Sequence, residues 1–143
     1  MRISEVLQNK STTDVVTISP DATVRELVAL LAEHNIGALI VSTDGSSVDG
    51  IASERDVVRR LNDEDSVLDG AVSGIMTTVV ETAEPDTLLE ELMKTMTDRR
   101  IRHVPVISQG TLTGIISIGD VVKHRIGQLE FERDQLDNYL HQT

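Results

Sequence analysis

Two short stretches of the chain combine a serine hydroxyl and a carboxylate at a spacing that suits ligand binding. In each stretch an apolar run ends in a serine, and an aspartate follows three residues later: Ser53 with Asp56, and Ser117 with Asp120. If a helix begins at each serine, its first backbone N–H groups converge with the hydroxyl and the carboxylate. Such a helix start can hold an anion or a polar ligand.

The same pattern has a simpler interpretation. Ser-x-x-Asp is close to a capping box, in which the serine and the residue three positions later satisfy the first N–H groups of a helix. Either stretch alone is most simply explained as a helix cap. A binding function gains weight because the stretch occurs twice.

The two stretches belong to an internal repeat. Ser19-Pro20-Asp21 matches Glu84-Pro85-Asp86, and after one deletion in a turn residues 50–56 match residues 114–120. Apolar periodicity predicts the order strand, helix, strand, strand, helix in each unit. A unit of about 60 residues is marginally stable alone. We therefore expect an α/β fold of tandem repeats, with the sheets packed around a pseudo-two-fold axis and a cleft between them.

The repeat defines the expected domain organisation. The first repeat, with a short N-terminal helix, spans residues 1–62, and the second, with a linker helix over 67–76, spans residues 63–127. A C-terminal helical extension covers residues 128–143. Each Pro-Asp turn is expected to start a helix, and Val79-Val80 is expected to begin the second sheet.

The composition excludes several classes of function. The 143 residues include 24 acidic and 13 basic side chains, which gives a net charge of −11 and disfavours binding to nucleic acid or to acidic membranes. No apolar run approaches the ~20 residues that span a bilayer, and no signal-peptide pattern is present. We expect a cytoplasmic protein that binds neither nucleic acid nor membrane.

The sequence also lacks the usual motifs of catalysis. It has no cysteine, no Gly-x-Ser-x-Gly motif, no Walker loop and no metal-ligand spacing among its four histidines. We therefore expect neither an enzyme nor a metal site. A small nucleotide hydrolase is disfavoured for the same reason.

Together these features make the sequence similar to a CBS-domain pair, the regulatory module named after cystathionine β-synthase. The resemblance covers about residues 2–127. It rests on the two Gly-h-x-Ser-x-x-Asp stretches (h is apolar), on the two Pro-Asp turns and on the segment from Ile101 to Val106. It implies a stand-alone, non-catalytic sensor that requires no cofactor and binds AMP, ADP, ATP, NAD(H) or S-adenosylmethionine in the cleft between repeats. Binding would change the conformation and so signal to an unidentified regulated protein.

The resemblance implies ligand contacts for nine residues. The two aspartates would hold ribose hydroxyls, the two serines would meet phosphate or ribose, and the two threonines would lie near adenine, between aliphatic side chains. The three basic residues would supply positive charge. The full set is Thr17, Ser53, Arg55, Asp56, Thr82, Arg102, His103, Ser117 and Asp120.

The two repeats differ in charge. The resemblance implies that Arg102-His103 reach phosphates, and Arg99-Arg100 either extend this basic segment or form a solvated helix end. The first repeat has Gly37-Ala38 at the equivalent position, and its cation is Arg55. We therefore predict that the Ser-x-x-Asp stretch containing Asp120 forms the better site for a phosphorylated nucleotide.

The end of the chain predicts a long amphipathic helix that continues past the repeat to Leu140. Apolar residues recur there at three- and four-residue spacing, interrupted by Arg133. An acidic protein should not leave such a stripe exposed, which favours a dimer arm in a homodimer. The alternatives are a helix folded back on its own domain and a contact to the regulated protein.

One alternative function stays open. In it the chain is a ligand-independent dimerisation or scaffold module, and both Ser-x-x-Asp stretches only cap their helices.

Overall fold

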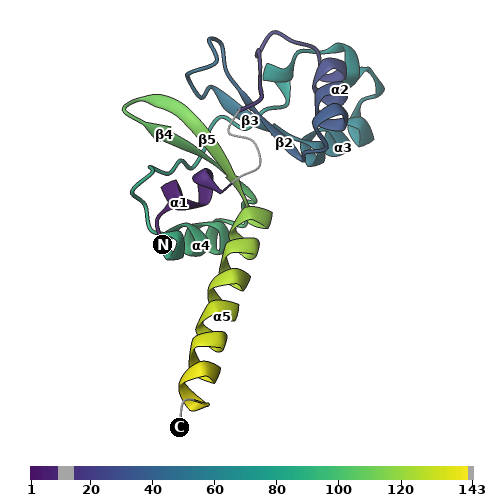
Figure 1. Cartoon of the computed structure of the whole chain (residues 1–143). Coiled ribbons are helices and arrows are strands. Elements are labelled where there is room, and N and C mark those ends of the chain that lie inside the picture. The colour runs from purple at the N-terminus through teal and green to yellow at the C-terminus, as the bar shows by residue number, and fades with distance from the viewer. Residues whose placement is uncertain (10–14, 142–143) are drawn as a thin grey trace.

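The computed structural model describes residues 1–9 and 15–141 and consists of two lobes with a long helix that projects away from them (Figure 1). Within these residues the secondary structure follows the repeat seen in the sequence. The elements are α1 (Ile3–Gln8), β1 (Thr17–Ile18), α2 (Val24–His34), β2 (Ala38–Val41), β3 (Gly50–Ser53), α3 (Glu54–Asp63), the 3₁₀ helices η1 (Asp65–Asp69) and η2 (Val72–Gly74), α4 (Leu89–Arg99), β4 (His103–Ser108), β5 (Thr111–Ser117) and α5 (Ile118–Leu140).

The expected tandem α/β architecture is confirmed, with one sheet more complete than the other. In the first repeat β2 pairs parallel with β1 and antiparallel with β3. In the second repeat β4 and β5 form an antiparallel pair. The place of β1 is taken by a single parallel bridge, in which Ala83 N donates to Pro105 O over 2.9 Å and Ile107 N donates to Ala83 O over 2.8 Å.

The second sheet does not begin at Val79-Val80, contrary to the expectation. Just before that point Thr77 pairs with Ile51 at the edge of the first sheet, through two backbone hydrogen bonds of 2.9 Å. The chain therefore reaches its own sheet only at Ala83. Val79 is left 88% exposed.

Two helical expectations also differ in detail. α2 begins at Val24 rather than at the Pro-Asp turn. Ala22 N donates to Ser19 O over 3.1 Å and so closes the turn before the helix. The Thr23 hydroxyl then caps the helix by accepting from Glu26 N. α4 likewise begins after Leu88. The expected linker helix over 67–76 is two short 3₁₀ helices, η1 and η2.

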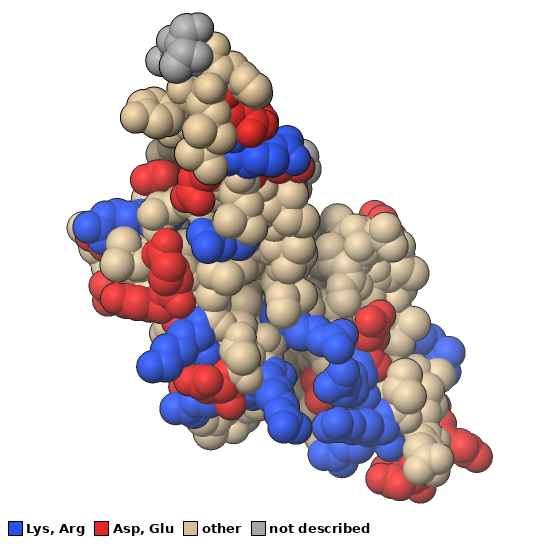
Figure 2. All heavy atoms as spheres, turned by 90° about the horizontal axis from the view of Figure 1, so that it is seen from below, with Lys and Arg blue, Asp and Glu red and all other residues tan. Residues whose placement is uncertain are grey.

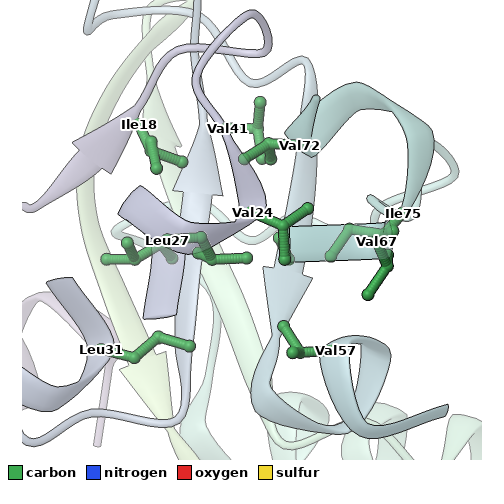
Figure 3. Close-up of a cluster of buried hydrophobic side chains, with 11 residues drawn as sticks. Ile18, Val24, Leu27, Leu31, Val41, Val57, Val67, Val72 and Ile75 are labelled. Carbon is green, nitrogen blue, oxygen red and sulfur yellow. The ribbon is translucent and has the colours of Figure 1, made fainter. Parts of the chain in front are cut away.

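Each repeat contributes a helical segment to the core of the other repeat. α1 buries Ile3 and Val6 in the second core, among residues of α4, β4 and β5. The linker packs back onto the first core, where Val67, Val72 and Ile75 meet α2 and the first sheet (Figure 3). The domain boundaries between residues 62 and 63 and between 127 and 128 stay a prediction. A division of the chain after residue 62 would separate each core from one of its helical segments.

The buried side chains of both cores are aliphatic, apart from Met96 in the second. α5 starts against α1, α4 and β5 and then leaves the lobes (Figure 1). Within residues 1–9 and 15–141, no helix is both long enough and apolar enough to cross a membrane.

The packing of α1 predicts a large effect for a substitution near the N-terminus. Ile3→Ala should lower the free energy of unfolding by about 2–5 kcal/mol, because it opens a cavity in the second core. Denaturant unfolding measures this. Val58→Ala on exposed α3 is the control and should change it by less than ~0.5 kcal/mol. Equal effects of the two substitutions would contradict the assignment of α1 to this core.

Candidate functional site

Both Ser-x-x-Asp stretches form capping boxes at helix starts. At α3, Asp56 N donates to Ser53 Oγ over 3.3 Å, while Ser53 N and Ser53 Oγ donate to Asp56 Oδ2 over 2.9 and 3.0 Å. At α5, Ser117 N donates to Asp120 Oδ2 over 2.9 Å, and Asp120 N donates to Ser117 Oγ over 3.2 Å. The predicted caps are thus confirmed, and they use one oxygen of each carboxylate.

A cavity of about 170 Å³ lies between the two repeats. Its walls come from β2 and β3, from the segment that follows the linker, and from the residues at the start of β4. The lining residues are Ala38, Ile51, Ser53, Thr77, Val79, Val80, Glu81, Ile101, Arg102 and His103. The capping serine of the first repeat therefore shares a cavity with the basic pair of the second.

His103 lies directly against the first repeat. A Cβ built at Gly37 would lie 3.7 Å from His103 Cε1 and 3.6 Å from Glu54 Oε1. Gly37 O also accepts from Glu54 N over 3.0 Å, at the start of α3. The imidazole is thus beside the helix start that Ser53 caps.

Arg102-His103 also adjoin the second capped helix start, since Arg102 O accepts from Ile118 N over 2.8 Å, so their pairing with Ser117 and Asp120 stays a prediction. His103 does lie opposite Ser117 in the β4–β5 ladder. The cavity that Arg102 and His103 line nevertheless contains Ser53, and neither Ser117 nor Asp120 is among its described lining residues. Ser53 shares the cavity with Arg102 and His103 because of how the two repeats pack together. The order of residues along the chain does not reveal that packing.

Charge at this cavity is unevenly balanced. Glu81 accepts from Arg99 in an ion pair of 3.1 Å, so the carboxylate in the cavity wall is already neutralised. In the part of the chain that the structure describes, no carboxylate lies within ion-pair distance of Arg102. Arg102 therefore gives the cavity a cation that can meet an anion.

The surface around the lobes shows a related pattern. On the face seen from below, Lys and Arg side chains gather in one region, whereas Asp and Glu are spread more widely (Figure 2). Among the exposed basic side chains are three on α3, Arg55, Arg59 and Arg60. A chain with a net charge of −11 thus still presents a local basic surface that attracts anions.

The remaining expected site residues lie outside this cavity. Thr17 is half-buried in β1, where it pairs with Ile40, and Thr82 is exposed between Glu81 and the Ala83 bridge. Arg55 is exposed on α3. The ligand contacts of all nine residues stay predictions.

The structure adds cavity residues that the sequence reasoning missed. Thr77, Val80 and Glu81 line it from the segment between η2 and the Ala83 bridge. The sequence held one signal for this segment. Val79-Val80 forms an apolar pair without the alternation expected of a half-buried strand.

Comparisons with known proteins agree with this architecture. The model of the CBS domain matches the chain twice, over residues 3–63 and 72–127. The CBS domain-containing protein YhcV of Bacillus subtilis is 30% identical over 96% of this chain and 96% of its own.

Two solved structures are also similar. A CBS-domain containing protein from Agrobacterium tumefaciens is 41% identical, with a TM-score of 0.82 over 87% of this chain and 99% of its own. A CBS domain protein from Pyrobaculum aerophilum, solved in complex with AMP, is 28% identical, with a TM-score of 0.75 over 84% of this chain and 89% of its own.

The capping boxes predict equal stabilising roles for the two serines. Ser53→Ala and Ser117→Ala should each lower the free energy of unfolding by about 1 kcal/mol, because each leaves an N–H group at a helix start without its acceptor. Thermal or denaturant unfolding without ligand measures this. Ser73→Ala, on an exposed residue of η2, is the control. A loss no larger than that of the control would contradict the capping role.

Proposed function

The chain belongs to the CBS-domain family, and from that premise we propose that the cavity between its repeats binds a phosphorylated adenosine ligand and that occupancy regulates another protein. One observation carries this proposal: Ser53, at a capped helix start of the first repeat, shares a cavity with Arg102 and His103 of the second. A hydroxyl, a guanidinium and an imidazole at one cavity suit a ligand with hydroxyl and phosphate groups.

The apolar wall of the cavity supports adenine as the buried part of the ligand. Ile51, Val79, Val80 and Ile101 supply aliphatic surface, and the Val79 side chain is largely exposed. At about 170 Å³ the cavity is smaller than the ~300–1,000 Å³ typical of sites that bury a whole ligand. It therefore accommodates a base, with the sugar and phosphate at its mouth.

Polar groups at the mouth support a ribose phosphate. Asp56 is held beside Ser53 by bonds to its Oδ2, which leaves Oδ1 as the acceptor for a ribose hydroxyl. The guanidinium of Arg102 can bind phosphate in a charge-assisted, two-pronged contact.

The comparison with the AMP complex of the Pyrobaculum aerophilum protein supports AMP as the first ligand to test. ADP, ATP and NAD(H) present the same base, ribose and a phosphate. S-adenosylmethionine carries a positive sulfonium and no phosphate, so Arg102 disfavours it.

The position of the cavity supports a regulatory role. Its walls come from both repeats, so a ligand that contacts both stabilises one relative arrangement of the lobes over others. A partner protein that recognises that arrangement would respond to the ligand.

The alternative is a ligand-independent dimerisation or scaffold module. The capping boxes support it, because they satisfy the hydrogen-bonding groups of each serine and one carboxylate oxygen of each aspartate within the chain. The basic, partly apolar cavity has no role in that alternative.

Removal of the cationic group tests the proposal. Arg102→Ala should weaken AMP binding by about tenfold or more, because a charge-assisted hydrogen bond contributes ~1.5–3 kcal/mol. Isothermal titration calorimetry measures the affinity. Arg25→Ala is the matched control, since Arg25 pairs with Asp69 away from the cavity. Equal affinities of the two variants would contradict the phosphate contact, and no heat with any phosphorylated adenosine ligand would favour the scaffold alternative.

The two carboxylates should contribute unequally. Asp56→Asn should weaken AMP binding more than Asp120→Asn, because Asp56 adjoins the cavity that contains Arg102. This order reverses the one that the sequence alone suggested. Competition binding with a fluorescent AMP analogue compares the two, and a larger loss for Asp120→Asn would restore the earlier order.

A further inference from the structure

An unpartnered apolar seam runs along α5. From Val122 to Leu140 the spacing alternates between four and three residues, which is the heptad pattern of a coiled coil. Its apolar members are between 49% and 60% exposed. In heptad letters, the d positions are Val122, Leu129 and Leu136, and the a positions are Ile126, Arg133 and Leu140.

The seam is not the face that packs on the chain's own lobes. Toward the lobes α5 buries Val121 and half-buries His124 and Gln128. At 100° per residue, Val122 and its seam lie about a third of a turn away from that face. Beyond its first turns α5 runs clear of both lobes (Figure 1). The seam therefore faces outward.

We propose that this seam pairs with the α5 seam of a second copy of the chain, and that the two helices run antiparallel. In antiparallel coils an a position packs against a d position of the partner. With the two-fold axis midway between Leu129 and Arg133, Val122 faces the partner's Leu140 and Ile126 faces the partner's Leu136. Four of the six seam layers are then wholly apolar.

The remaining two layers explain why the seam contains an arginine. Arg133 faces the partner's Leu129, and its aliphatic stem covers that leucine while the guanidinium reaches the helix edge. There it meets the partner's Glu130 and the partner's Glu132, which flank the seam. The two arginines thus lie among four carboxylates, so each arginine has an acidic neighbour, and the arginines offset the like charges that Glu130 and Glu132 bring to the axis.

Charges in and beside the seam favour this orientation over the parallel one. In the antiparallel pair Lys123 lies beside the partner's Asp137, twice by symmetry. In a parallel, in-register pair Arg133 would meet the partner's Arg133 inside the seam, and Glu132 would face the partner's Asp137. The parallel pair also has a favourable edge contact, Arg125 with the partner's Glu130, which matches the Lys123 contact in kind. The two orientations therefore differ mainly in the Arg133 pair that the parallel one places inside the seam.

Disulfide trapping tests the orientation directly, because the full chain contains no cysteine. Ile126→Cys and Leu136→Cys are made as separate full-length variants, mixed, allowed to exchange and oxidised, and the products are weighed by intact mass spectrometry. The antiparallel seam predicts mainly the mixed product that links 126 to 136. Mainly identical pairs would overturn the orientation, and no cross-link above that of Phe131→Cys, on the opposite face, would overturn the pairing.

Self-association gives a second, independent readout. Leu129→Asp should raise the dissociation constant of the dimer by about tenfold or more in light scattering or sedimentation. Phe131→Asp makes the same kind of change on the same helix, outside the seam, and should leave the dimer unchanged. A monomeric wild type, or equal effects of the two variants, would overturn the proposal.

Discussion

The site depends on one backbone contact between the repeats. Ile51 and Thr77 exchange two hydrogen bonds of 2.9 Å, which attach the linker's exit to the edge of the first sheet. Gly50 permits this approach, since a Cβ at that position would come within 2.7 Å of Thr77 O. Because the chain is held there, Val79 and Glu81 lie over the cavity before the second sheet begins at Ala83.

The two lobes are also joined because each core includes a helical segment from the other repeat. α1 completes the second core and the linker completes the first, so neither lobe is built from one continuous half of the sequence. A ligand that contacts both walls of the cavity acts on two lobes that already share their helices. In the proposed regulation, a ligand that favours one relative arrangement would therefore act on both lobes at once.

Much of this architecture could be predicted from local signals. The doubled Ser-x-x-Asp stretches encode their own caps, since serine and aspartate satisfy each other within one helix turn. That Arg102 and Ser53 line one cavity could not be predicted in the same way, because it depends on packing between segments far apart in the chain. The prediction of a single linker helix was wrong for the same reason. Val24 N donates to Gly70 O and Val72 N donates to Ala22 O, and these bonds to the first repeat hold the linker in shorter turns.

The central claim is that one ligand contacts both repeats at this cavity. The most direct measurement is a titration of the isotope-labelled protein with AMP, followed by amide resonances in NMR spectra. The account predicts that signals of Ser53, of residues 77–81 and of residues 101–103 shift together, with one common affinity. Shifts confined to one repeat, or found only around Ser117 and Asp120, would contradict it.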